Sequence, residues 1–287
     1  MCPISDISVG KMLAWQSRGV SSAIQMLVLG GLQLYSTNAL GLDAALVGTL
    51  LMVGVVIDAV CVLFGGYIVD RTNTRWGRGR PYELCLIGLW VSTWILFSAP
   101  AEASILVKSI WVFTAHAFAR SLFSTLLGVS NVVYMVRAFN NEQAYIKINS
   151  IGSLIVVSFT VVFNLVFPML QAEIIFDAQG WSRMVGFIAI PMTIIGMMRF
   201  IFIKEDKNID AHAAKVNFKD VIAVLKHNKY IYLVAFAIFA QAVFVGKGLA
   251  SYYYIYVVGN LAVFGPISLV GVFAMFSLLF YPALLKK

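Results

Sequence analysis

Two charged side chains lie inside stretches of sequence that are otherwise almost entirely apolar. Asp58 lies near the middle of the apolar run 44–69, and Arg120 lies in the interior of the run 109–136. A charge at the centre of a lipid bilayer costs about 3 kcal/mol by insertion scales unless it is paired, hydrated or neutralised. Asp58 is therefore a candidate for holding a cation or carrying a proton, with Arg120 modulating it. The alternative is an inert ion pair in which each charge neutralises the other.

Other polar side chains in these apolar runs are candidates for lining a cavity that holds a polar solute. Hydroxyl, amide and ammonium groups bind such solutes through hydrogen bonds. The candidates are Ser22, Gln25, Asn131, Asn149 and Lys247. Lys247 could equally pair with another residue, or extend its ammonium group to the membrane surface.

The sequence offers little that is typical of enzymes. No nucleotide-binding loop or catalytic triad pattern is evident. The cysteines Cys2, Cys61 and Cys85 lack the spacing of metal ligands or of paired cysteines. We therefore expect neither an enzyme nor a resident metal or organic cofactor, while a coupling ion such as H⁺ or Na⁺ fits the charged side chains.

The elements that carry these residues are long apolar segments. Of the 287 residues, 61% are hydrophobic and only 12% are charged, which is typical of a chain whose solvent is lipid. Segments near or above the roughly 20 residues of a membrane-spanning helix satisfy their backbone groups internally only as helices. We expect an all-α, polytopic membrane protein with about eight transmembrane helices at residues 21–37, 44–69, 82–98, 109–136, 148–170, 184–203, 230–258 and 264–285.

The basic residues predict the orientation of these helices. Seventeen of the 21 Lys and Arg residues lie on one predicted side, namely before the first span, in or bordering every second gap, or after the last span. The other four are Lys108, Arg120, Arg183 and Lys247. Cytoplasmic loops carry this excess of positive charge. We therefore expect a multi-pass protein of the cell membrane with both termini cytoplasmic. The net charge of +8 then faces anionic lipid, and no nucleic-acid partner is expected.

The strongest local motif joins the second and third spans. It runs from Gly66 to Pro81 as GYIVDRTNTRWGRGRP, and its candidate gate residues are Gly66, Asp70, Arg71, Thr72, Arg75, Gly77, Arg78, Arg80 and Pro81. Glycine lets a neighbouring helix approach closely, while the arginines can latch cytoplasmic helix ends through charge-assisted hydrogen bonds. Anchoring by positive charge alone would explain the arginines but not the Gly, Asp, Thr and Pro positions.

With this motif the chain resembles the major facilitator superfamily, and within it the glycoside-pentoside-hexuronide:cation symporters typified by the melibiose carrier. Four further patches are similar to that family: TNALGL at 37–42 with LVGT at 46–49, the segment 217–229, YYYIYVVG at 252–259, and PALLKK at 282–287.

The resemblance implies a fold of twelve helices in two six-helix bundles that rock about a midplane site. Residues 1–203 would form the first bundle, 204–229 the cytoplasmic connector and 230–287 the first two helices of an incomplete second bundle. The chain would then stop after its eighth helix, as a fragment, a truncated product or a self-assembling half that lacks its C-terminal part.

The resemblance also implies that Asp58 serves the coupling cation, but the rest of the acidic site departs from the family pattern. Val62 stands where the family has its second carboxylate, Ser22 where it has a sugar-contacting acid, and Leu127 near the position of a third acid. Sodium prefers several oxygen ligands, whereas a proton needs one titratable group. This loss favours a proton as the coupling ion.

Three functions follow as hypotheses. The first is cation- or proton-coupled symport of a sugar or glycoside. The second keeps the fold but carries a lysolipid-like amphiphile, because the missing acids are those that recognise sugar hydroxyls. The third is a truncated membrane protein that does not transport.

Overall fold

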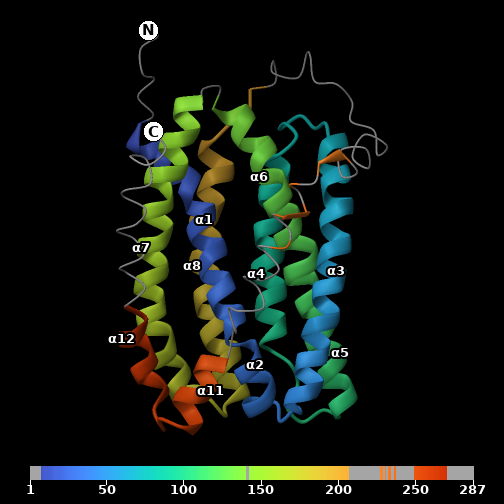
Figure 1. The fold of residues 1–287 in the computed structure, drawn as a ribbon, viewed down its shortest axis with the longest axis vertical. Helices are drawn as coiled ribbons and strands as arrows, with labels where there is room; N and C mark the ends of the chain where they lie inside the picture. The colour runs from blue at the N-terminus through green and yellow to red at the C-terminus, as the bar shows by residue number, and fades with distance from the viewer. Residues whose placement is uncertain are drawn as a thin grey trace.

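The computed structural model describes residues 8–139, 142–206 and 249–269, together with positions 227, 228, 230, 232, 233 and 236. These residues form a bundle of long helices that run side by side (Figure 1). The predicted all-α fold is thereby confirmed for the described part of the chain.

The first helix is longer than its apolar run predicts. It starts as α1 (Val9–Gly30), capped by the Ser8 side chain, and continues through α2 (Leu32–Leu34) into the π-helical turn η1 (Tyr35–Ala39). The helix therefore begins before the predicted start of the span at residue 21, and Arg18 lies inside the helix. The reason is that the polar residues of its first half are buried against neighbouring helices.

The following helices come in the predicted order. They are α3 (Ala44–Arg71), η2 (Arg80–Leu84), α4 (Cys85–Leu96), α5 (Ile105–His116), η3 (Ala117–Ser124), α6 (Thr125–Ala138), α7 (Glu142–Ile174) and α8 (Ala178–Phe202). The elements α5, η3 and α6 form one continuous helix in which η3 is a π-helical segment. Asp43 caps α3 by accepting hydrogen bonds from the backbone N–H groups of Ala45 and Leu46.

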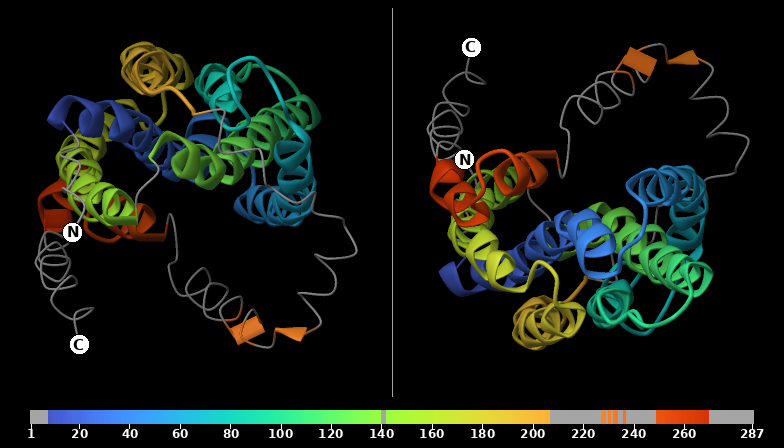
Figure 2. Two further views of the ribbon diagram at one scale, coloured as in Figure 1. Left: turned by 90° about the horizontal axis from the view of Figure 1, so that it is seen from above. Right: turned by 90° about the horizontal axis from the view of Figure 1, so that it is seen from below.

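Helix α1 lies at the centre of the packing. It contacts α7, α8 and α4, as the views along the bundle show (Figure 2). Aromatic side chains fill much of the adjoining core, where Phe97 stacks on Trp181 and both rings contact Tyr35. Trp90 is 1% exposed and its indole N–H donates to Ser21 Oγ, which in turn donates to Met192 O of α8. These two hydrogen bonds join three helices in an apolar interior.

The outward faces of the helices are apolar. Phe187 is 82% exposed and Ile190 is 67% exposed, which would be unfavourable in water but is suited to lipid. Within the described residues four helical segments are long and apolar enough to cross a membrane, namely Ala44–Arg71, Ile105–Ala138, Lys147–Ile174 and Ala178–Phe202. The chain is thus a multi-pass membrane protein.

The last two predicted spans, 230–258 and 264–285, lie largely outside the described residues, as does the connector 204–229. What is described consists of α11 (Leu249–Tyr256), η5 (Leu261–Val263) and α12 (Phe264–Ser268). Helix α12 packs along α7, and α11 reaches the end of the first helix, where Thr37 Oγ1 and Tyr252 OH are 2.7 Å apart (Figure 1). The division into bundles at residue 203 stays a prediction.

The packing around Trp90 generates a first prediction. Truncation of this side chain in Trp90→Ala leaves a large cavity and removes the bond to Ser21, which should lower the free energy of unfolding by about 3–5 kcal/mol. The apparent melting temperature of the purified protein in detergent would measure this loss. Phe187→Ala, at an exposed site, serves as the control and should melt within a degree or two of the original protein.

Candidate functional site

The carboxylate of Asp58 on α3 faces the π-helical segment η3. Arg120 Nε lies 3.3 Å from Asp58 Oδ2, and Ser121 Oγ donates a hydrogen bond of 2.5 Å to Asp58 Oδ1. The Asp58 side chain is 21% exposed and that of Arg120 is 36% exposed. Each oxygen of the carboxylate therefore accepts a hydrogen bond. The ion pair is still partly exposed at the surface of the described bundle.

The π-helical geometry of η3 explains how two consecutive residues reach one carboxylate. In an α-helix, side chains of adjacent residues point in directions about 100° apart. The wider turn of a π-helix alters this angle between adjacent side chains. Such turns occur frequently at functional sites. Ser121 was not predicted as a site residue, because nothing in an apolar run signals a π-helical turn in advance.

At the positions where the symporter family has further acidic residues, this chain has side chains that add no ligand to the Asp58 site. Val62 is 50% exposed and apolar, Leu127 is buried in the core, and the hydroxyl of Ser22 is buried with no hydrogen-bond partner within the described residues. No cluster of three or more His, Cys, Asp or Glu side chains suited to a metal ion occurs in the part of the chain that the structure describes. His116 lies one turn before Arg120, with its ring against Gly54.

Two of the predicted cavity residues instead hold helices together. Gln25 is 1% exposed, and its amide donates to Thr93 Oγ1 at 3.0 Å between α1 and α4. Asn131 Oδ1 accepts from Arg18 Nη2 at 2.6 Å and from Arg199 Nη2 at 2.9 Å. These contacts occupy polar atoms of both side chains in packing between helices, and a role of either residue in lining a solute cavity stays a prediction.

The remaining cavity candidates are not tested by these contacts. Asn149 is exposed on α7 and stays a prediction, whereas Lys247 lies outside the described residues. Ser22, with its buried hydroxyl, also stays a prediction.

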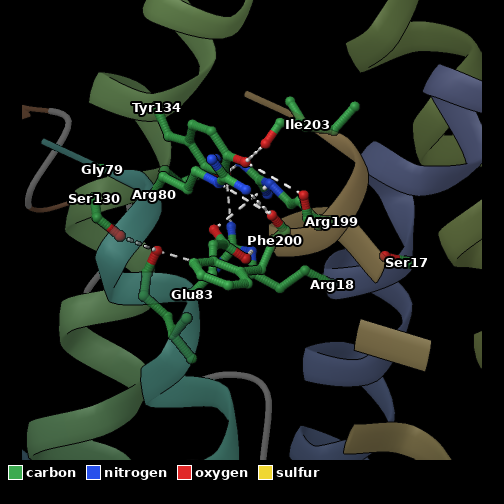
Figure 3. A network of polar contacts seen from close by, with 12 residues as sticks. Ser17, Arg18, Gly79, Arg80, Glu83, Ser130, Tyr134, Arg199, Phe200 and Ile203 are labelled. Atoms are coloured by element: carbon green, nitrogen blue, oxygen red, sulfur yellow. Dashed lines mark hydrogen bonds and ion pairs between the residues drawn. The ribbon is translucent and has the colours of Figure 1, made fainter. Parts of the chain in front are cut away.

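A second buried carboxylate was not anticipated. Glu83 in η2 is fully buried between two guanidinium groups, with Arg18 Nε 3.7 Å from Oε2 and Arg199 Nε 3.5 Å from Oε1 (Figure 3). Arg199 also lies over the Trp15 ring, with Cζ 3.3 Å from its centroid. We call Arg18, Glu83 and Arg199 the buried charge cluster.

The buried charge cluster joins four helices at one end of the bundle. Arg18 comes from α1, Glu83 from η2 and Arg199 from α8, and the shared acceptor Asn131 belongs to α6. Sequence reasoning placed both arginines only on the cytoplasmic side, because basic residues near span ends usually mark that side. The signal that could have found the cluster is Glu83 at the start of an apolar run.

The motif between the second and third helices adopts a compact loop, residues 72–81, which we call the arginine loop. Gly77 has a φ of 117°, which favours glycine. Arg80 donates through Nε and Nη2 to Phe200 O at 3.0 and 2.8 Å, and Thr72 Oγ1 lies 2.5 Å from Tyr82 OH. The loop thus makes hydrogen bonds to its own bundle.

Three residues of the motif make different contacts from those expected. A Cβ on Gly66 would lie 4.0 Å from Val129, an ordinary contact, so close helix approach does not require this glycine. Asp70 is exposed and has no hydrogen bond or ion pair within the described residues. The Arg71 guanidinium packs on the ring of Tyr67 in its own helix. Neither Asp70 nor Arg71 therefore latches a second helix end within the described residues.

This architecture defines a class: a polytopic helical membrane protein with charged groups at membrane depth. The family of MFS/sugar transport proteins matches residues 19–287, and the chain belongs to that family. The resemblance inferred from the sequence is thus confirmed. The members are transporters, which accords with the expectation that the chain is not an enzyme.

Two relatives are about a quarter identical to the chain over the aligned residues, and a third is more similar over a short segment. It is 25% identical over 203 residues to the isoprimeverose transporter of Lactiplantibacillus pentosus, covering 69% of this chain and 42% of that protein. It is 27% identical over 250 residues to the lactose permease of Leuconostoc lactis, covering 79% and 37%. A segment of 50 residues is 46% identical to the glucuronide carrier protein homolog of Escherichia coli strain K12, covering 17% and 11%.

The chain therefore spans less than half the length of the relatives it matches. This share is 42% for the first relative and 37% for the second.

The buried charge cluster yields a second prediction. Glu83→Gln leaves two buried guanidinium groups without a counter-charge, which should lower the free energy of unfolding by about 3–5 kcal/mol. Thermal unfolding in detergent would show the loss, while Glu102→Gln, at an exposed turn, should have almost no effect. A Glu83→Gln protein as stable as the original would contradict a stabilising role for this carboxylate.

Proposed function

We propose that the chain functions as, or within, a secondary active transporter that couples the movement of a cation or proton to symport of a sugar or glycoside. The observation that supports this most is the family match over residues 19–287, together with relatives named for isoprimeverose, lactose and glucuronides. The protein would reside in the cell membrane with both termini cytoplasmic.

The proposed coupling group is the carboxylate of Asp58. Its oxygens accept from Ser121 and pair with Arg120, and this set contains a single carboxylate. A sodium ion prefers several oxygen ligands and would be repelled by the guanidinium, whereas a proton needs one titratable oxygen. We therefore favour H⁺ over Na⁺ as the coupling ion. Protonation of Asp58 would weaken its attraction to Arg120 and free that side chain.

The arginine loop would serve as part of the cytoplasmic gate. Its hydrogen bonds to α8 keep it at the end of the bundle where α1 begins. In transporters of this architecture, rocking of one half against the other opens and closes that end. The exposed guanidinium groups of Arg71 and Arg75 would face the other half or anionic lipid.

The role of Asp58 leads to a third prediction. Asp58→Asn should abolish accumulation of a labelled glycoside such as lactose in membrane vesicles with an imposed proton gradient, a loss of about tenfold or more. Asp177→Asn, at an exposed ion pair with Arg183, is the matched control and should accumulate normally. Membrane levels of the variants would be compared by immunoblot. Unchanged accumulation in Asp58→Asn would remove Asp58 from coupling.

The choice of ion leads to a fourth prediction. With a proton as the coupling ion, accumulation driven by an imposed pH gradient should be insensitive to replacing Na⁺ by K⁺ on both sides of the vesicle membrane. Accumulation that instead follows an imposed sodium gradient would show that Na⁺ is the coupling ion. The measurement is initial uptake under each gradient alone.

The same vesicles separate the two alternatives. Competition of uptake by a lysophospholipid, but not by galactosides, would favour an amphiphile as the cargo, because the acids missing at position 22 and near position 127 are those that would bind sugar hydroxyls. No uptake of either by the native chain would favour a membrane protein that does not transport by itself.

A further inference from the structure

Glu205 lies just beyond the end of α8, and its carboxylate is enclosed by the arginine loop. Arg78 N donates to Oε2 at 2.9 Å, Gly79 N donates to Oε1 at 2.8 Å, and Arg80 N also donates to Oε1. Successive backbone N–H groups that converge on one anion form a concave anion-binding site. The Glu205 side chain is only 1% exposed, so these donors replace its water shell.

Two glycines of the loop make room for this arrangement. A Cβ on Gly77 would collide with the Glu205 carboxylate, and the positive φ of Gly77 independently disfavours any side chain there. A Cβ on Gly79 would lie within 3 Å of the Tyr134 backbone on α6. The spacing of Gly77 and Gly79 thus lets the loop backbone approach both the carboxylate and a neighbouring helix.

The same carboxylate connects the loop to two helix ends. Arg137 Nη1, in the last turn of α6, lies 3.8 Å from Glu205 Oε2, and Asp206 N donates to Arg137 O at 3.0 Å. Arg80 extends its guanidinium back to the last turn of α8, where it donates to Phe200 O and lies over the Phe200 ring. Loop, α6 and α8 are therefore joined through the surroundings of one acid.

Other arginines of the loop region remain directed outward. Arg71 and Arg75 are exposed, and each packs on an aromatic ring close to it in sequence, Tyr67 and Trp76 respectively. The part of the loop around Glu205 is thus buried and fixed to the bundle, whereas its outer face carries positive charge. A shift of this buried part would move the positive charge relative to the other half of the transporter or to anionic lipid.

We propose that Glu205 is a positioning residue for the arginine loop. Its carboxylate sets the conformation of residues 77–80 and fixes the loop to α6 and α8, so that the loop moves with these helices as one body. The consequence for transport rests on the proposed function, whereas the ordering of the loop does not.

Hydrogen–deuterium exchange of the purified full chain in detergent tests the ordering directly. In Glu205→Gln one carboxylate oxygen becomes an NH₂ group that faces a backbone N–H, and the negative charge is lost. Exchange of the amides of residues 78–80 should accelerate about tenfold or more, because local opening becomes easier. Exchange in the core of α4 should stay unchanged, as should residues 78–80 in Glu173→Gln, a change at an exposed acid on α7.

Transport kinetics supply the second readout. Glu205→Gln should reduce the maximal uptake rate severalfold and leave KM for the glycoside unchanged, because the loop contains none of the candidate residues for the solute cavity. Glu205→Asp keeps the charge and should recover much of the rate and of the exchange protection. This conservative variant also decides the question if Glu205→Gln does not accumulate in the membrane.

Unchanged exchange at residues 78–80 in Glu205→Gln would overturn the proposal. Faster exchange that is spread evenly over α4 and α8 would also overturn it, because it would mean general destabilisation. A local acceleration with a normal uptake rate would support the ordering of the loop and overturn its consequence for transport. If the original chain shows no uptake at all, the proposed function fails, and the exchange measurement alone then decides whether Glu205 orders the loop.

Discussion

The structure depends on the compensation of charge inside a medium of low dielectric. Glu83 has no contact with solvent, and it is held between Arg18 and Arg199, which come from two different helices. Removing Glu83 would leave two buried guanidinium groups without a counter-charge, so the meeting of the two arginines depends on this carboxylate. Because their helices are distant in sequence, this requirement fixes how α1, η2 and α8 meet.

The carboxylates of Glu83 and Asp58 have different environments and suit different roles. Glu83 is fully buried between two guanidinium groups, one of which lies over the Trp15 ring, so its carboxylate is not reachable from the surface of the described bundle. Asp58 has a single guanidinium partner and one hydroxyl donor, and part of its side chain is exposed. A group that exchanges an ion must be reachable, which is why Asp58, and not Glu83, is the candidate for coupling.

The end of the bundle that contains Glu83 also contains the Glu205 contacts. Tyr134 connects the two regions, because its ring lies beside Arg199 and its hydroxyl donates to Ile203 O at 2.8 Å. Hydrogen bonds and ion pairs therefore join α1, α6, α8 and the arginine loop at one end. By contrast, the Asp58 site lies near the middle of α3, where a π-helical segment supplies the only polar partners among the described residues.

Much of the fold was predictable because lipid imposes simple rules on sequence. Apolar runs of sufficient length must be helices, and the motif from Gly66 to Pro81 identified the family from one loop and a few supporting patches. The pairing of Asp58 with Arg120 was also predictable, since two opposite charges at membrane depth stabilise each other. The start of the first helix was not, because buried polar residues look the same in sequence as exposed ones.

The sequence by itself determined the class of protein and the order of the helices in its described part, and it singled out Asp58 and Arg120 as charged residues within apolar segments. Only the tertiary structure decided which polar residues hold helices together, as it did for Gln25 and Asn131. It also decided that Ser121 joins Asp58 and that Glu205 is the anion within the arginine loop. The physical reason is that hydropathy is a property of each segment, whereas a hydrogen-bond partner depends on how segments that are far apart in sequence are brought together.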